Sequence, residues 1–249
     1  MKIKMKSIGG SMLITLSFVV FVGILSSVAM MIMKNPMDHI SLISGAAQLL
    51  YLVPVLIIFK IKKISFTERC YIKTVPLKKY LFPVIAAFGF SSFSSIIQES
   101  VPIPQSLLGN ATEDLGNSVA AYIAAIFIIA PIIEEIVFRG LIMTRLRKTF
   151  SAGWAIFFSA LLFGFIHLMT GSVVTAIHAF LGGLIFALTY EKTGSLIPAV
   201  IAHFSANVGG LVPGLVRNCD VIVQYGIAVV FAVISVLACI VIAKSKIRV

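Results

Sequence analysis

Five ionisable residues lie inside strongly apolar stretches of this sequence. Glu134, Glu135 and Arg139 share one stretch, and His167 and His203 lie in two later ones. A charge at the centre of a helix in lipid costs on the order of 2.5–3.5 kcal/mol, so such residues usually face a polar interior and serve function. The sequence therefore predicts a polar site assembled from three apolar segments.

Helical spacing assigns a partner to two of the three charges in the first stretch. Glu135 and Arg139 are four residues apart and share a helical face, so a salt bridge would offset both burial costs. Glu134 is rotated about 100° away from Glu135 and has no evident partner on its own helix. An unpaired carboxylate suits a group that accepts a proton or holds a metal ion.

The two histidines each share a helical face with another residue of interest. Phe163 lies four residues before His167, and Asn207 lies four residues after His203. Together with Glu134, the two imidazoles could ligate a metal, most simply zinc, and leave a position for water. Equally, Glu134 could act as general base while the imidazoles position water and stabilise an oxyanion. Asn207 would donate to that oxyanion, add a ligand or orient a neighbour.

Each residue also has an ordinary structural interpretation. A lone histidine in a membrane helix more often packs or hydrogen-bonds than ligates a metal, and a lone Glu–Arg pair can serve helix association alone. We interpret His178 and His39 in this structural sense. The functional hypothesis rests on the combination of residues.

The composition predicts an all-α, polytopic membrane bundle. Hydrophobic residues make up 59% and charged residues 12% of the 249 positions, and the mean hydropathy is +1.09, more apolar than a soluble domain of this size. Windows of about 20 apolar residues give eight spans within a single integral membrane domain, 1–249. They lie near 11–33, 40–59, 80–97, 118–143, 153–169, 173–190, 196–216 and 221–243.

The distribution of basic residues predicts the orientation of these spans. Seventeen of the 20 Lys and Arg residues fall at the two chain ends or in alternate loops, whereas Lys34 and Arg217 fall on the other side and Arg139 lies within a span. Because positive residues are retained on the cytoplasmic side, we expect both termini in the cytoplasm. The net charge of +11 is explained by this pattern, so nucleic acid is not expected as a partner. Three cysteines without metal-ligand spacing predict no disulfide framework.

The ordered motifs resemble those of a known family. Glu134-Glu135-x-x-x-Arg139, Phe163-x-x-x-His167 and His203-x-x-x-Asn207, on three successive motif-bearing spans, are similar to the motifs of the CPBP intramembrane proteases. That family includes CAAX prenyl endopeptidases of the Rce1 type and the bacteriocin-processing or immunity proteins also called the Abi family. The resemblance covers about 118–210 and identifies this segment as a protease-like core.

The resemblance implies peptide-bond hydrolysis by a glutamate-activated water, with or without a bound metal ion. It makes Glu134 the catalytic glutamate and His167 its water-positioning or metal-binding partner. His203 and Asn207 would complete the site. The supporting residues would be Glu135, Arg139 and Phe163.

Three functions therefore remain open on the sequence. The leading one is a CPBP-type metalloendopeptidase that cleaves peptide or membrane-protein substrates in the bilayer. The alternatives are a transporter or channel that binds a cation or proton at the same cluster, and an immunity protein that acts by binding. A short basic chain without targeting extensions favours a bacterial plasma membrane. By analogy, it favours leader peptides, pheromones or bacteriocins over prenylated CAAX proteins as substrates.

Overall fold

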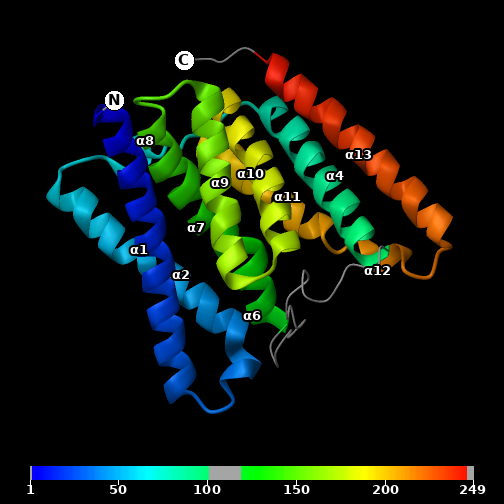
Figure 1. Cartoon of the computed structure of the whole chain (residues 1–249), viewed down its shortest axis with the longest axis horizontal. Coiled ribbons are helices and arrows are strands. Elements are labelled where there is room, and N and C mark those ends of the chain that lie inside the picture. The colour runs from blue at the N-terminus through cyan, green and yellow to red at the C-terminus, as the bar shows by residue number, and fades with distance from the viewer. Residues whose placement is uncertain (1, 101–118, 246–249) are drawn as a thin grey trace.

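The protein is built from helices. The computed structural model describes residues 2–100 and 119–245, and every regular element within them is helical (Figure 1). The first half contains α1 (Lys2–Ile32), η1 (Pro36–His39), α2 (Ile40–Ile61), α3 (Phe66–Arg69) and α4 (Lys78–Ser100). The second half contains α6 (Val119–Ile123), η2 (Ala124–Ile129), α7 (Ala130–Glu135), η3 (Ile136–Met143), α8 (Thr144–Leu146), α9 (Ala152–Thr170), α10 (Val173–Thr193), α11 (Leu196–Gly209), α12 (Val212–Val216) and α13 (Val221–Lys244).

Several of these helices, alone or joined end to end, are long and apolar enough to cross a bilayer. Seven segments of the described chain meet that description by length and composition, which confirms a polytopic helical bundle. They are Ile3–Ile32, Ile40–Ile61, Lys78–Ser100, Val119–Leu146, Val173–Thr193, Leu196–Val216 and Val221–Lys244. The fifth predicted span corresponds to α9, whose apolar part, Ala152–Leu168, is shorter than the other seven.

The fourth span is a composite helix at the centre of the molecule. It runs continuously through α6, η2, α7, η3 and α8, and both η2 and η3 are π-helical. All eight residues of η3 are buried, as expected for a helix that other helices surround. Wide π-turns of this kind occur frequently at functional sites, and here they flank the Glu134-Glu135 pair at the end of α7.

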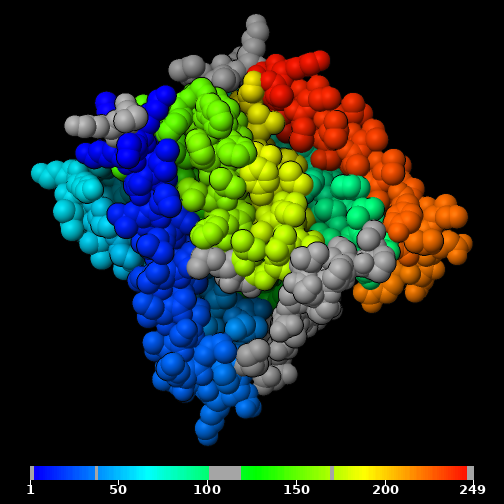
Figure 2. Space-filling view, viewed as in Figure 1, coloured from blue at the N-terminus to red at the C-terminus, as the bar shows by residue number. Residues whose placement is uncertain are grey.

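The surrounding helices do not pack in chain order, because α4 lies between helices of the second half of the chain. Helices α9 and α10 pack against each other, and α4 packs against both α11 and α13. Figure 2 shows α1, α9, α10, α4 and α13 side by side across one face. Gly194 ends α10 with a left-handed backbone (φ 66°), which glycine adopts without strain, and the Ser195 hydroxyl then accepts the Ile197 N–H to cap α11. This turn brings α11 back beside α10.

The basic loops gather at one end of the bundle, which we call the basic end: residues 60–79, 144–151 and 192–195 with the first turn of α1 and the last turn of α13. Arg145 donates to the Lys6 carbonyl at 3.2 Å, and Lys79 donates to the Thr193 carbonyl at 2.9 Å. Figure 1 shows the start of α1 and the end of α13 at this same end. Their shared position agrees with an even number of crossings.

The cytoplasmic orientation of the basic end stays a prediction, and the native cysteines can test it. Cys219 is exposed between α12 and α13, whereas Cys70 is buried at the basic end. Burial raises the pKa of the Cys70 thiol to about 12, against the opposing effect of Arg69, so little reactive thiolate forms. We expect a membrane-impermeant maleimide to label Cys219 on intact cells, and Cys219→Ser to abolish that labelling.

A cysteine placed at the basic end provides the matched control. In the Cys219→Ser background, Ser245→Cys should be labelled after permeabilisation and not before. The reverse pattern at the two positions would show that the basic end faces outward.

Candidate active site

A fully buried ion pair forms the base of the candidate site. Arg139 Nη1 lies 2.8 Å from Glu135 Oε1, and both side chains have an exposed fraction of 0%. The pairing predicted from their four-residue spacing is therefore confirmed, across the junction of α7 and η3. A buried pair of this kind is best tolerated when further hydrogen bonds satisfy its remaining polar atoms; among the described residues, Arg139 Nε and Glu135 Oε2 have no such partner.

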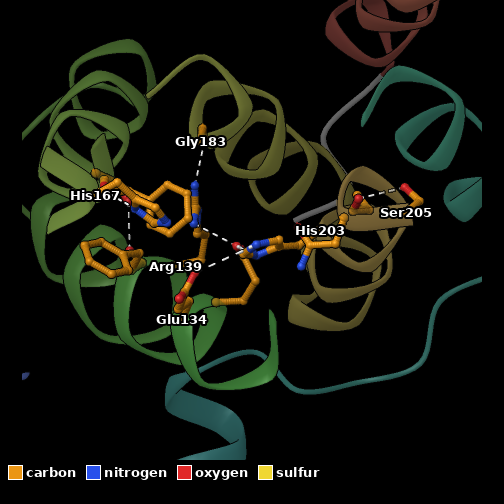
Figure 3. A network of polar contacts seen from close by, with 12 residues as sticks. Glu134, Arg139, His167, Gly183, His203 and Ser205 are labelled. Atoms are coloured by element: carbon orange, nitrogen blue, oxygen red, sulfur yellow. Dashed lines mark hydrogen bonds and ion pairs between the residues drawn. The ribbon is translucent and has the colours of Figure 1, made fainter. Parts of the chain in front are cut away.

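Helix α10 supplies one of these further contacts. Arg139 Nη2 donates to the Gly183 carbonyl at 2.7 Å (Figure 3). Gly183 also has to be small, because an added Cβ would lie 3.1 Å from Phe163 Cδ1 and 3.2 Å from Arg139 Nη2. The guanidinium carbon lies 4.9 Å from the Phe163 ring centroid and 5.4 Å from that of Phe186. Cation–π contacts therefore add to the stabilisation of the buried charge.

The other end of the network holds His203 of α11. Its Nδ1 lies 3.1 Å from Glu135 Oε1, the same oxygen that accepts from Arg139. An ionised carboxylate only accepts hydrogen bonds, so Nδ1 carries the proton and donates it. The imidazole also stacks on Phe186, with centroids 4.5 Å apart and planes at 17°. The hydrogen bond to Glu135 places a proton on Nδ1, and the stacking on Phe186 fixes the plane of the ring.

Glu134 lies on the remaining side of His203. Its Oε2 is 3.8 Å from His203 Nε2, and its side chain keeps an exposed fraction of 11%, against 0% for Glu135. That separation exceeds a direct hydrogen bond and is of the size that a bridging water spans. The two adjacent glutamates thus have different environments: Glu135 is fixed by Arg139, whereas Glu134 is the more accessible carboxylate.

His167 joins the network through Phe163. Its Nδ1 lies 2.9 Å from the Phe163 carbonyl, which can only accept, so Nδ1 carries the proton here as well. The Phe163 ring contacts His167 at a centroid distance of 4.6 Å and His203 at 5.7 Å. The phenyl ring therefore packs against both imidazoles. Because each Nδ1 atom is already hydrogen-bonded, the Nε2 atoms are the nitrogens left to bind water or substrate.

Asn207 makes a different contact from those of the other predicted residues. Its Nδ2 donates at 2.7 Å to the carbonyl of Ile126, within the π-helical turn η2. The amide therefore ties α11 to the helix that carries the two glutamates. Its predicted role toward an oxyanion stays a prediction.

Comparison with known proteins bears on the same segment. Residues 116–209 match the family model described as type II CAAX prenyl endopeptidase Rce1-like. This segment is therefore similar to the Rce1-like family, and we call residues 116–209 the Rce1-like core. The matched residues include all three motifs, and the assignment of 118–210 as a protease-like core stays a prediction. Neither the curated proteins nor the solved structures contain a match to this chain.

The predicted ligands in the Rce1-like core are of the types that zinc binds, but their side chains are not grouped as a zinc site requires. Within the described residues, no three His, Cys, Asp or Glu side chains are grouped closely enough to hold a metal ion. The predicted ligands Glu134, His167 and His203 thus do not form such a group as they lie here. The zinc assignment stays a prediction, and no mechanistic step below passes through a metal.

Two residues that contribute to the Rce1-like core, Phe186 and Gly183, were not predicted from the sequence as parts of the site. Phe186 stacks on His203 and faces Arg139, yet its sequence context is that of any apolar helix. The carbonyl of Gly183 accepts from Arg139, although the Gly182-Gly183 pair indicates only close helix packing. The three-residue interval between Gly183 and Phe186 places them on one face of α10, which is the signal that could have linked them.

The buried pair gives a quantitative prediction. Arg139→Met should lower the free energy of unfolding by about 3–5 kcal/mol, because it leaves the Glu135 carboxylate buried without its cation. Glu135→Gln combined with Arg139→Met should cost clearly less than the sum of the two single changes. Reversible unfolding of the four proteins in mixed micelles measures the coupling.

The exposed pair of Arg217 and Glu99 is the matched control. Its atoms are also 2.8 Å apart, but the side chains are 66% and 39% exposed, so a coupling of about 0–1 kcal/mol is expected. Equal coupling in the two cycles would contradict the account of a burial-dependent pair.

Proposed function

We propose that this chain is an intramembrane endopeptidase in which the Glu134 carboxylate activates a water molecule. The observation that carries the proposal is that the two adjacent glutamate side chains have different environments. Glu135 is neutralised by Arg139 at 2.8 Å, whereas Glu134 is partly accessible and faces His203 Nε2 at 3.8 Å. The Rce1-like match over 116–209 supports peptide-bond hydrolysis as the reaction class.

The hydrogen-bond directions support a role for water between Glu134 and His203. With the proton of His203 on Nδ1, its Nε2 is an acceptor, and an ionised Glu134 is an acceptor too. A water molecule has two protons to donate and can bind both groups. The water oxygen is then left free to attack a carbonyl carbon, while Glu134 accepts the proton that the water loses.

The later steps follow from the same groups. Attack on the peptide carbonyl gives a tetrahedral oxyanion, and Glu134 then transfers its proton to the leaving amine nitrogen as the C–N bond breaks. His167 would help to position the substrate: its Nδ1 proton is held by the Phe163 carbonyl, so the Nε2 of the neutral ring can accept a hydrogen bond from a substrate N–H group. Asn207 would hold α11 in register with the catalytic helix through Ile126.

The substrate proposed is a peptide or a membrane-protein segment that reaches the site within the bilayer. The similarity to type II CAAX prenyl endopeptidases supports a CAAX-type substrate. Leader peptides, pheromones and bacteriocins are the further candidates from the sequence, as is a role in self-immunity. Substrate trapping identifies the class directly: Glu134→Gln in native membranes should retain bound peptides that can be sequenced.

Replacement of the Glu134 carboxylate tests the reaction. Glu134→Gln keeps the size of the side chain but removes the proton acceptor, so peptide cleavage by the purified protein should fall by about 10²–10⁴-fold. Glu191→Gln is the matched control, because Glu191 pairs with Arg147 at the basic end, 3.1 Å away. It should cleave at the wild-type rate, and the thermal unfolding of both variants should resemble that of the wild type.

Two results would contradict the proposal. Full cleavage by Glu134→Gln would exclude the glutamate as the base. Self-immunity or solute flux that survives loss of the Glu134 carboxylate, with no cleavage by the wild type, would instead favour a binding protein or a transporter.

A further inference from the structure

A groove of about 410 Å³ opens at the basic end, away from the candidate active site. Its walls come from the start of α4, the end of α10 and the end of α13. Figure 1 shows the start of α4 and the end of α13 together at this end of the bundle. The groove therefore lies where membrane-spanning helices emerge, at the depth of lipid headgroups.

Among the described residues, every charged side chain that lines the groove is a lysine. Lys78 and Lys79 come from α4, and Lys192 comes from α10. Lys192 Nζ donates to the Ser245 carbonyl at 3.2 Å, which holds its ammonium against the end of α13. An ammonium has three donors, so Lys192 keeps donors for another acceptor. Glu191, next to Lys192 in the chain, binds Arg147 instead. The groove thus presents fixed positive charge to an anion.

The other wall of the groove is apolar and faces outward. Phe82 is 37% exposed and Val241 is 42% exposed, whereas Ile242 of α13 is buried. Phe82 lies about one turn after Lys78 and Lys79 on α4, and Val241 lies about one turn before the end of α13, so both are on the membrane side of the lysines. A ligand that suits both walls has an anionic head and an apolar tail.

We propose that this groove binds an anionic phospholipid. Its phosphate would lie among Lys78, Lys79 and Lys192, and its acyl chains would run along Phe82 and Val241. Basic pockets between membrane helices bind anionic headgroups in this way. A free phosphate would gain nothing from the apolar wall. The site is separate from Glu134, so the proposal does not depend on the proposed function.

Lipid binding to the full-length protein in neutral detergent tests the proposal by native mass spectrometry. The probes are phosphatidylglycerol and phosphatidylcholine with identical acyl chains. The wild type should prefer phosphatidylglycerol. Because a juxtamembrane lysine contributes about a fivefold factor in affinity, Lys78→Gln/Lys192→Gln should weaken that binding roughly thirtyfold. Lys60→Gln/Lys62→Gln, at exposed positions outside the groove, removes the same charge and should bind as the wild type does.

Several outcomes would overturn the proposal. Equal binding of the two lipids would remove the headgroup preference, and equal loss in the two double variants would show that binding follows net charge. Displacement of phosphatidylglycerol by an equal concentration of inorganic phosphate would indicate a free-anion site, and displacement by an acidic peptide would indicate a peptide site. Should the groove variant fail to fold, the single change Lys78→Gln, at an exposed position, gives the same comparison with an expected fivefold loss.

Discussion

The burial of the Arg139 guanidinium is the constraint on which the rest of the structure depends. A permanently charged group with no exposed surface has to find its partners inside the protein. Arg139 obtains a carboxylate from Glu135 of its own helix, a carbonyl from Gly183 of α10 and ring faces from Phe163 and Phe186. These partners come from three segments of the bundle, so satisfying one charge fixes the relative positions of α7, α9 and α10.

The Glu135–Arg139 pair also contacts a fourth helix, α11. Glu135 Oε1 accepts from both Arg139 and His203, which ties α11 to the centre of the bundle and selects the tautomer of the imidazole. In the neutral ring, this tautomer turns the Nε2 lone pair toward Glu134. The chemistry proposed for Glu134 therefore rests on its neighbour: Glu135 supplies fixed geometry, and Glu134 supplies a carboxylate free to exchange a proton. Two identical side chains divide these roles because their environments differ.

Hydropathy and spacing predicted much of this arrangement, and tertiary packing decided the rest. The positions of the long spans and the Glu135–Arg139 bridge follow from periodicities that act within a single helix. The contact of His203 with Glu135 as well as Glu134 depends on how α11 approaches α7, and no local pattern encodes that approach. The π-helical form of η2 and η3 was likewise not predicted. Asn207 is a further example: its place on the same face of α11 as His203 was predicted from spacing, but its hydrogen bond to the Ile126 carbonyl was not.

The central claim is that the buried Glu135–Arg139 pair sets the proton position on His203 and so prepares Nε2 to face Glu134. Nitrogen-15 NMR of ring-labelled His203 in lipid bilayers measures that proton position directly. The account predicts a protonated Nδ1 and an unprotonated Nε2 in the wild type, with loss of this preference when Glu135→Leu removes the acceptor. A wild-type ring protonated on Nε2 alone, or a tautomer unchanged in the Glu135→Leu variant, would contradict it.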